Sequence, residues 1–267
     1  CLNSIKKYPP GIEIELIIVD NNSLENKTKK FLSNLKTSYF NDFDIKIIEF
    51  KNKFNFSSIV NKGVNVSCGD VILLLNNDTE FLTRNWGYYI ASNALRSDVG
   101  CVGIKLLYPD KTIQHAGIIL GIGGIAGYAY KFFDDSYLGN GNRLIHSQEY
   151  SALTGACLGI SKKNWILVGG MDNINLPINY NDVDLCLKCI DKGLKNIFLP
   201  NIKALHYESK TRGKPQGNDY INWKKEKKFM KKKWGNLLKN DAYYSPHLTL
   251  EREDWSLSGK YTKLKLR

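Results

Sequence analysis

Three short segments contain the residue types that metal binding and proton transfer require. The first is Asn76-Asn77-Asp78, which directly follows the apolar run at residues 71–75. Mg²⁺ and Mn²⁺ take oxygen ligands, usually one or two protein carboxylates together with substrate phosphates. A carboxylate at the end of a buried strand suits such a site, so Asp78 is a candidate metal ligand. The alternative is that Asp78 caps the element that follows.

Asp182 and Asp184 form the second segment, inside Asn181-Asp182-Val183-Asp184-Leu185. Residues two positions apart do not share a helix face, so the two carboxylates should have different tasks. At the start of a helix, Asp182 can project into a cleft as a general base while Asp184 supports the loop or the helix N-terminus. The alternative is that both acids only cap the helix.

The third segment contains His206, Lys210 and Arg212 and follows a short apolar run at residues 196–200. Imidazole suits Mn²⁺ better than Mg²⁺, and the two cationic side chains can hold phosphates. A single histidine is nevertheless more often structural. The same choice applies to His115, which lies near a predicted strand and either contacts a substrate or is a satisfied core group.

The elements that must position these residues alternate between strands and helices. We predict strands at residues 15–20, 45–50 and 71–75, and helices at 25–35, 56–66 and 83–95. This alternation indicates an open α/β sheet with helices on its faces. Such sheets bind ligands beyond the carboxyl ends of their strands. Asp20 ends the first predicted strand and Asn22 lies in the turn after it, while Asp78 follows the third strand, so both turns should lie on one rim.

After about residue 97 the pattern is less regular and richer in glycine. Strand-like segments are predicted at residues 99–108, 112–130 and 150–160, with a hairpin signal at 109–111, and helices at 162–168 and 183–191. No internal repeat and no low-complexity linker interrupts the chain. We therefore expect one mixed α/β unit rather than two separable domains.

The composition excludes several classes of protein. Of 267 residues, 43% are hydrophobic and 24% are charged, which argues against disorder. No apolar stretch is long enough for a membrane-spanning helix. Six scattered cysteines are too few for a disulfide scaffold, which indicates a reducing, cytoplasmic compartment. We interpret the C-x-x-C of Cys186 and Cys189 as buried helical thiols rather than a redox pair or half a zinc site.

The net charge of +12 is concentrated in one stretch. Residues 203–239 contain twelve basic and three acidic residues, most densely in a predicted helix at 224–234. A solvated lysine face, attraction to an anionic membrane and attraction to phosphate-bearing ligands are the interpretations that this helix leaves open. No nucleic-acid partner is expected, because the stretch lacks the aromatic–basic motifs of an RNA-binding sheet.

In order along the chain, these motifs resemble those of the family 2 glycosyltransferases. The nucleotide-sugar half is represented by residues 15–23, 54–63 and 69–80, and the acceptor half by residues 106–117, 154–157, 169–172, 181–186 and 206–213. The resemblance covers about residues 12–256. It is strongest to enzymes that build bacterial O-antigens, capsules and other surface glycans, including rhamnosyltransferase-like members.

The resemblance implies a fold and its division. The fold is GT-A, a mixed and mostly parallel sheet flanked by helices. The glycosyltransferase domain would span residues 1–240, with the nucleotide-sugar half at about 1–97 and the acceptor half at about 98–240. Residues 241–267 would form a C-terminal tail.

The resemblance also implies roles for individual positions. Asp182 matches the general base. Asp78 and His206 match ligands of a divalent metal, Mn²⁺ or Mg²⁺. The nucleotide sugar would be bound by Asp20, Asn22, Asn61, Asn77, Lys210 and Arg212. The acceptor side would include His115, Thr154, Gly155, Asp172 and Asp184.

The implied activity is transfer of a sugar from a UDP- or dTDP-linked donor to a hydroxyl of a growing surface glycan or a lipid-linked acceptor. One base and one metal carboxylate suffice for a single in-line displacement, so inversion without a covalent intermediate is expected. We expect a cytoplasmic protein, with peripheral contact at the inner face of the plasma membrane as a further expectation. The alternative is a catalytically inactive domain of the same fold that binds sugar nucleotides or glycans.

Three features depart from the family's pattern. Asn76 replaces the first acid of the D-x-D motif, and Asn181 replaces the usual Glu before the base. The family's first apolar strand is also missing, because only residues 1–10 precede the strand at 15–20. We expect an N-terminally truncated domain whose sheet lacks a central strand between residues 16–19 and 71–75. We also expect this segment to fold poorly or bind nucleotide weakly unless upstream sequence is restored.

Overall fold

The structure is a computed structural model that describes residues 1–35, 43–208 and 217–259. Lys210 and Arg212, two of the predicted phosphate contacts, lie outside the described residues. Within the described ranges, no helix combines the length and the apolar character needed to cross a membrane.

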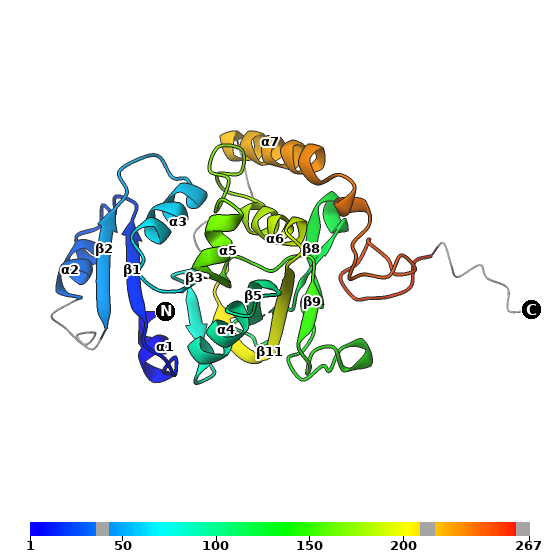
Figure 1. Cartoon of the computed structure of the whole chain (residues 1–267), viewed down its shortest axis with the longest axis horizontal. Coiled ribbons are helices and arrows are strands. Elements are labelled where there is room, and N and C mark those ends of the chain that lie inside the picture. Colours follow the sequence, from blue (N-terminus) through cyan, green and yellow to red (C-terminus); the bar gives the residue numbers. More distant parts are fainter. Residues whose placement is uncertain (36–42, 209–216, 260–267) are drawn as a thin grey trace, which may run out of the picture.

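The first part of the chain forms a small two-stranded sheet with helices beside it (Figure 1). Its elements are α1 (Leu2–Lys7), β1 (Glu15–Asp20), α2 (Asn26–Asn34), β2 (Asp44–Glu49) and α3 (Phe56–Asn65). β1 and β2 pair in parallel, with Glu15 opposite Asp44. All six residues of β1 are only half-buried and α2 buries no residue, so this region has a thin core.

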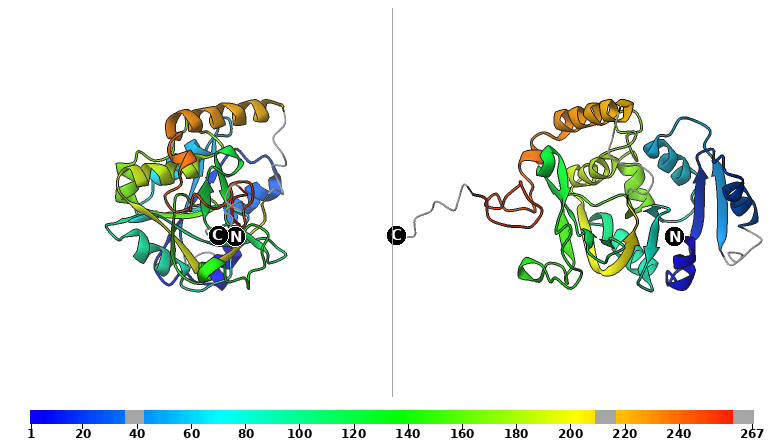
Figure 2. Two further views of the ribbon diagram at one scale, coloured as in Figure 1. Left: turned by 90° about the vertical axis from the view of Figure 1, so that its right-hand side faces the viewer. Right: turned by 180° about the vertical axis from the view of Figure 1, so that it is seen from behind.

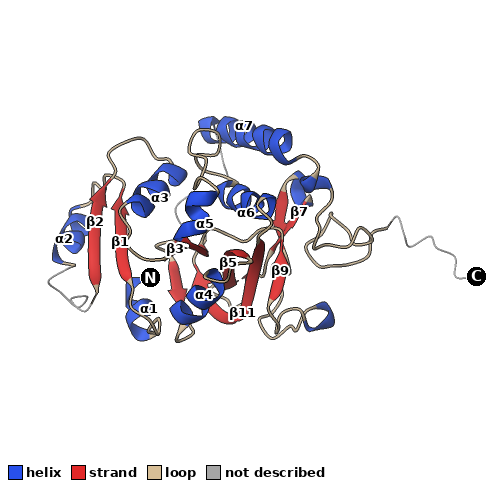
Figure 3. Ribbon diagram, viewed as in Figure 1, coloured by secondary structure: helices blue, strands red, loops and turns tan. Residues whose placement is uncertain are grey.

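A seven-stranded mixed sheet forms the centre of the molecule (Figure 3). The strand order is β3-β10-β5-β11-β4, with β6 added to β5 and β9 added to β11. The elements are β3 (Val71–Leu75), β4 (Thr79–Phe81), α4 (Trp86–Ala94), β5 (Val99–Leu107), β6 (Ile113–His115), β9 (Gln148–Tyr150), β10 (Cys157–Ser161), α5 (Lys162–Leu167), α6 (Asn181–Asp191) and β11 (Lys195–His206). Every residue of β5 and β10 is buried, as expected for strands covered on both faces.

The remaining elements lie outside the central sheet. They are the hairpin of β7 (Ile118–Leu120) and β8 (Ala126–Tyr128), helix α7 (Gly217–Trp234) and the short helices η1 (Ile122–Gly124), η2 (Asn140–Asn142) and η3 (Leu237–Lys239). Figures 1 and 2 show α7 along the outer edge of the molecule, beyond α6. The lysine-rich stretch is therefore helical, as predicted, and the fully buried Met230 anchors it to the core.

The sheet is mixed, as expected, but the prediction that it is mostly parallel is wrong. Among the described strands, only β1 with β2 and β5 with β11 pair in parallel. β10 runs antiparallel to both of its neighbours, and β5 is joined to β6 by the short turn predicted at residues 109–111. Short turns connect only antiparallel neighbours, and the glycine-rich half of the chain uses them.

The expected interruption of the sheet is observed. β1 pairs with β2 and β3 pairs with β10, but the described strands include none between β1 and β3. The start of α3 instead bonds to the loop that precedes α6. The Ser57 hydroxyl donates to the Leu176 carbonyl at 2.6 Å, and Asn55 Nδ2 donates to the Asn173 carbonyl at 2.9 Å.

The cysteines of the C-x-x-C are buried thiols, as interpreted. Cys186 and Cys189 lie on α6 and are 0% exposed. The sulfur of Cys189 is 3.8 Å from that of Cys101 on β5, and all three are free thiols. Hydrogen bonds with the Cys186 and Cys189 thiols, together with burial, raise the pKa of Cys101, so this cluster acts as apolar packing.

The described part of the predicted tail packs on the domain. Asp241 Oδ2 accepts from the Leu120 amide and Oδ1 accepts from the Ser151 hydroxyl, each at 2.7 Å. The Trp255 ring stacks on Tyr130 at 5.6 Å between centroids. Residues 241–259 therefore extend the hydrophobic core on the side of the β7–β8 hairpin.

Candidate active site

Asp78 and His206 meet where two strands of the central sheet pair. β4 begins one residue after Asp78 and runs antiparallel to β11, which places His206 opposite Thr79. The Tyr207 amide donates to the Asp78 carbonyl at 3.0 Å and continues the ladder. Asp78 Oδ1 lies 3.2 Å from His206 Nε2. The backbone pairing thus brings together two residues that are far apart in sequence.

Gln114 on β6 fixes the orientation of the His206 ring. Its amide oxygen lies 2.6 Å from His206 Nδ1, and an amide oxygen can only accept, so Nδ1 carries the hydrogen. Nε2 then faces Asp78 Oδ1 and the Asn76 amide nitrogen, which lies 3.2 Å away. A histidine held in this way presents Nε2 as a metal ligand.

These atoms fit a small divalent cation. Two ligands about 2.1 Å from an octahedral metal and at right angles to each other stand about 3.0 Å apart, close to the observed 3.2 Å between Asp78 Oδ1 and His206 Nε2. The described residues contain no group of three or more His, Cys, Asp or Glu side chains around one point. The other positions around a metal would therefore be left for water and phosphate oxygens, as is usual for Mg²⁺.

Asp182 lies in the first turn of α6, with its carboxylate held by backbone amides. Oδ2 accepts from the Gly155 amide at 2.9 Å and Oδ1 accepts from the Val183 amide at 2.8 Å. Tyr180, directly before the helix, has a left-handed φ of 60°, which is an unusual conformation for a bulky residue. Burial raises the pKa of the Asp182 carboxyl, although these hydrogen bonds oppose the shift. The result is an oriented carboxylate that is more basic than an ordinary aspartate.

The turn at residues 154–156 connects Asp182 to the strand end that carries the candidate metal ligands. The Gly155 amide binds Asp182, and the next residue, Ala156, accepts a hydrogen bond from the Asn76 amide at 2.9 Å. A Cβ on Gly155 would stand 3.2 Å from that of Asp182, so a larger residue there would push against the carboxylate. One short turn therefore sets the position of the candidate base relative to the candidate metal ligands.

His115 supports this turn from inside the core. It is fully buried; Nδ1 donates to the Ile104 carbonyl at 3.2 Å and Nε2 accepts from the Thr154 amide at 3.3 Å. Burial lowers the pKa of His115 to about 4, so the ring is neutral near pH 7. This geometry matches the core-group alternative. The predicted acceptor-side role of His115 would operate through Thr154, whose hydroxyl lies 3.4 Å from that of Tyr128.

Asp172 and Asp184 are bound within the protein. Asp184 is 0% exposed, and its Oδ1 accepts from Lys233 Nζ at 2.7 Å and Trp234 Nε1 at 2.8 Å. It thereby joins α6 to α7. Asp172 Oδ1 accepts from the Asn175 amide at 2.8 Å and closes a turn. The acceptor-side roles of both residues stay predictions.

The predicted nucleotide contacts are spread over the junction between the two sheets. Asp20 ends β1, where its Oδ1 accepts from the Ser23 amide at 3.1 Å, and Asn22 is exposed with a φ of 58°. On α3, Asn61 Nδ2 donates to the Met171 carbonyl at 2.9 Å and Asn61 Oδ1 accepts from the Met171 amide at 3.0 Å. Asn77 is exposed beside Asp78.

Sequence reasoning missed Gln114, Asn76 and Glu226 as site residues. Gln114 is 2% exposed; its one sequence signal is an amide inside a predicted strand, where a buried polar group needs a partner. In the sequence, Asn76 stands out only as a replacement for the first acid of the D-x-D motif. Buried Glu226 on α7 accepts from the Ile178 amide at 2.8 Å and the Asn179 amide at 3.1 Å, and so supports the loop before Asp182.

Comparisons with solved structures identify the fold. By fold the chain is a GT-A protein: it matches a crystal structure of GalNAc-T7 with UDP, GalNAc and Mn²⁺ at a TM-score of 0.67 and 14% identity, covering 90% of this chain and 45% of that one. The mannosyltransferase PcManGT from Pyrobaculum calidifontis, in complex with GDP-Man and Mn²⁺, matches at a TM-score of 0.56 and 14% identity, covering 79% of this chain and 53% of that one.

The sequence comparisons find a family model for the first part of the chain and two longer relatives. Residues 1–114 match the family model described as glycosyl transferase family 2. The uncharacterized protein y4gI of Sinorhizobium fredii is 36% identical over 91% of this chain, and the O-antigen biosynthesis protein RfbC of Myxococcus xanthus is 28% identical over 94%. The chain spans only 27% and 19% of the lengths of these two relatives. Residues 1–114 therefore resemble the family 2 glycosyltransferases, and the chain as a whole has the GT-A fold.

Proposed function

We propose that the chain is the catalytic domain of an inverting glycosyltransferase that moves a sugar from a UDP- or dTDP-linked donor to a hydroxyl of a surface glycan or a lipid-linked acceptor. Support comes from the family, from the relative named for O-antigen biosynthesis and from GT-A neighbours that contain UDP or GDP-Man with Mn²⁺. The observation that carries the proposal is the 3.2 Å Asp78–His206 pair, joined to Asp182 through residues 154–156.

Asp78 and His206 would hold a divalent metal, Mn²⁺ or Mg²⁺, with Gln114 fixing the ring and Asn76 beside it. A metal bound there would neutralise charge that develops on the departing diphosphate. Lys210 and Arg212, which follow His206 by four and six residues, would bind the phosphates. Asp20 and Asn22 at the end of β1 would contact the nucleoside, and Asn61 and Asn77 would complete the donor site.

Asp182 would act as the general base. Its carboxylate takes the proton of the acceptor hydroxyl as that oxygen forms a bond to the anomeric carbon and the bond from that carbon to the diphosphate oxygen breaks. The raised pKa of Asp182 makes it a stronger base, and the Gly155 and Val183 amides hold it in place. A single displacement inverts the anomeric carbon. Thr154, Gly155 and the residues that hold the turn would shape the acceptor side.

The proposed function includes a domain organisation and a cellular location. The glycosyltransferase domain would cover residues 1–240, divided near residue 97, with 241–267 as a tail. The domain would work in the cytoplasm, at the inner face of the plasma membrane.

A donor screen tests the function. Thermal unfolding would be followed with UDP-, dTDP- and GDP-sugars, each with and without Mn²⁺. A donor at 100 times its Kd adds about 2.7 kcal/mol, so we expect Tm to rise by about 5–10 °C with one nucleotide class. His206→Ala should remove the Mn²⁺-dependent part of the rise, while exposed His146→Ala should not. No shift with any donor would contradict the proposal.

A second test separates the enzyme from the inactive binding domain. With the donor identified, NMR of the product should show the anomeric configuration opposite to that of the donor sugar. Donor binding without turnover for any hydroxyl acceptor would favour the binding domain. Retention of configuration would contradict the single displacement at Asp182.

A further inference from the structure

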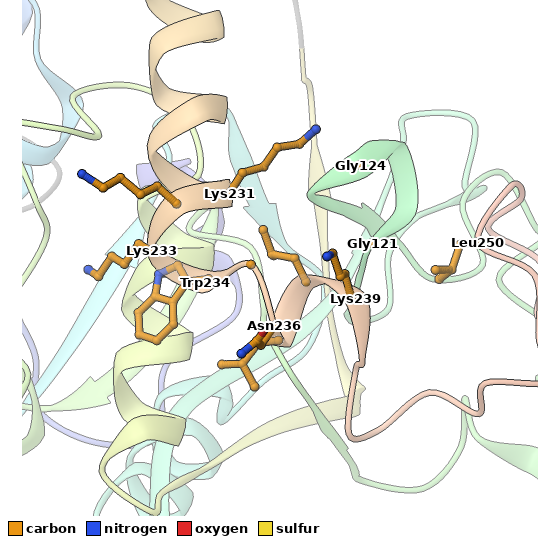
Figure 4. Close-up of a pocket in the computed structure, with 12 residues that line it drawn as sticks. Gly121, Gly124, Lys231, Lys233, Trp234, Asn236, Lys239 and Leu250 are labelled. Carbon is orange, nitrogen blue, oxygen red and sulfur yellow. The ribbon is translucent and has the colours of Figure 1, made fainter.

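A basic pocket lies at the C-terminal end of α7, away from the residues assigned above. It has a volume of about 850 Å³ and is bounded by α7, by residues 235–239 that follow it, by the glycine turn at 121–124 and by Leu250. Figure 4 shows Lys231 and Lys239 on the side of the pocket that faces Gly124 and Gly121. No residue of this pocket belongs to the proposed donor or metal site.

Three lysines of the pocket have uncompensated charge. Lys231, Lys232 and Lys239 are exposed, and among the described residues no acid lies within ion-pair distance of them. Other lysines of α7 are already engaged: Lys233 binds Asp184, and Lys227 Nζ donates to the Gly123 carbonyl at 2.9 Å. Like charges gathered around one cavity repel each other, so an anion there would relieve the repulsion.

The glycine turn leaves the mouth of the pocket open. Gly121 and Gly124 have φ values of +89° and +85°, which side-chain-bearing residues rarely adopt. A Cβ on Gly124 would stand 3.6 Å from Lys227 Nζ and 4.0 Å from Lys231 Nζ. Because Gly124 has no Cβ, the space beside the Lys227 and Lys231 amines is left free.

Apolar side chains also line the pocket. Trp234, Leu237 and Leu250 line the same cavity as the lysines, and Leu250 is 39% exposed. A free phosphate would use the lysines alone, whereas a phosphate joined to hydrocarbon would also cover these apolar side chains. Lysine and tryptophan side by side are typical of surfaces that lie in the headgroup region of a membrane.

Helix α7 is also rigidly joined to the helix of the candidate base. Asp184 on α6 holds Lys233 and Trp234, and Glu226 holds the loop before Asp182. A lipid bound at the end of α7 would therefore orient the acceptor side of the domain toward the membrane.

We propose that this pocket binds the phosphate of an anionic lipid and docks the domain on a membrane surface. The inference does not depend on the proposed transferase activity, because it is tested by binding alone. Each lysine near an anionic surface contributes about a factor of five in binding.

Vesicle co-sedimentation of the whole chain tests the proposal. The chain should bind vesicles that contain phosphatidylglycerol and not pure phosphatidylcholine. Lys231→Gln with Lys239→Gln should weaken binding about 25-fold. The matched control, Lys224→Gln with Lys225→Gln, makes the same charge change on exposed residues elsewhere on α7 and should weaken it less than threefold.

Several results would overturn the proposal. Equal losses in the two double variants would show diffuse attraction to the whole helix rather than a pocket. Absence of binding to the phosphatidylglycerol vesicles, or equal binding to both vesicle types, would exclude recognition of lipid phosphate. A further contrary result would be that inorganic phosphate binds the pocket as tightly as vesicle lipid does and loses affinity equally in the Lys231→Gln, Lys239→Gln variant. That result would show that the lipid chain is not recognised. Far-UV circular dichroism of each variant confirms that the fold is kept.

Discussion

The small β1–β2 sheet and the central sheet differ in how firmly they hold their site residues. All six residues of β1 are only half-buried, whereas all nine residues of β5 are buried. The small sheet carries Asp20, a proposed nucleotide contact. The central sheet and α6 carry Asp78, His206 and Asp182. The proposed chemistry thus rests on the densely packed region and the proposed recognition of the nucleoside on the thinly packed one.

This difference fits the demands of the two tasks. Proton transfer and metal binding need atoms placed within a few tenths of an ångström, and a close-packed sheet supplies that precision. Binding of a nucleoside tolerates an element that settles when the ligand arrives, because loosely packed regions open at low free-energy cost. The predictions below test whether the two regions behave so differently.

The largest stability difference is expected between matched isoleucines. Ile104 on β5 is 0% exposed, while Ile17 on β1 is half-buried. Ile104→Ala should lower the free energy of unfolding by about 2–5 kcal/mol, and Ile17→Ala by about 1–2 kcal/mol. Urea unfolding followed by circular dichroism measures both. Equal losses would show that the two sheets are packed alike.

The buried His115 should make the central region sensitive to acid. Its pKa is about 4 in the folded state and about 6.5 in an unfolded chain, so the unfolded state binds the proton first. The stability from the neutral ring is present above pH 6.5 and is lost as pH falls toward 4, a change of about 3 kcal/mol.

Denaturant unfolding between pH 7 and pH 4 measures this loss. The unfolding free energy of His115→Asn should approach that of the parent as the pH falls, because the variant lacks the titration. His146→Asn, at an exposed position, should follow the parent at every pH. A constant difference between His115→Asn and the parent would refute the assignment.

Gln114 should govern metal affinity while Asp20 should not. Removing a residue that orients a ligating histidine typically costs about 10–100-fold in metal affinity, so Gln114→Ala should weaken Mn²⁺ binding by that factor. Asp20→Ala should weaken nucleotide binding and leave the metal affinity within about twofold. Mn²⁺ titration followed by electron paramagnetic resonance, with saturating nucleotide, measures the metal affinity of both variants. An unchanged metal affinity in Gln114→Ala would exclude its positioning role.

The smallest expected effect concerns the joint between the regions. Asn61 on α3 binds the Met171 backbone through both amide atoms, so Asn61→Ala should cost about 1–2 kcal/mol. Amide hydrogen exchange should accelerate in α3 and β1 but not in β5. Asn65→Ala, an exposed change on the same helix, provides the control. Faster exchange throughout β5 would mean that the two sheets unfold together.

The sequence was sufficient for the local elements and for the ends of strands. Residues 15–20 and 71–75 form strands with the predicted bounds, because short apolar runs bounded by polar turns have few other solutions. The gap between these strands was also predicted. Asp182 was placed correctly at the start of a helix, because two acids before an apolar pattern are typical of a helix N-terminus.

The residues that these side chains contact in the fold could not be predicted from the sequence. The pairing of Gln114 with His206 depends on β6 and β11 both lying beside β5, which local periodicity does not encode. The burial of Asp184 depends on α7, and the lysine-rich pattern of that helix does not specify which residue it contacts. Antiparallel pairing of β10 was missed for the same reason, since strand direction in a sheet is a tertiary property.

The central claim is that Asp182 is the base of a transferase, and one comparison tests it most directly. Donor affinity and turnover would be measured for the parent chain and for Asp182→Asn, which keeps the shape of the side chain and the hydrogen bond that Oδ1 accepts from the Val183 amide. We predict a turnover lower by about 10²–10⁴-fold with a donor Kd within about twofold. In the parent, turnover should fall as the pH drops through the raised pKa of this carboxyl. Undiminished turnover in Asp182→Asn would contradict the account.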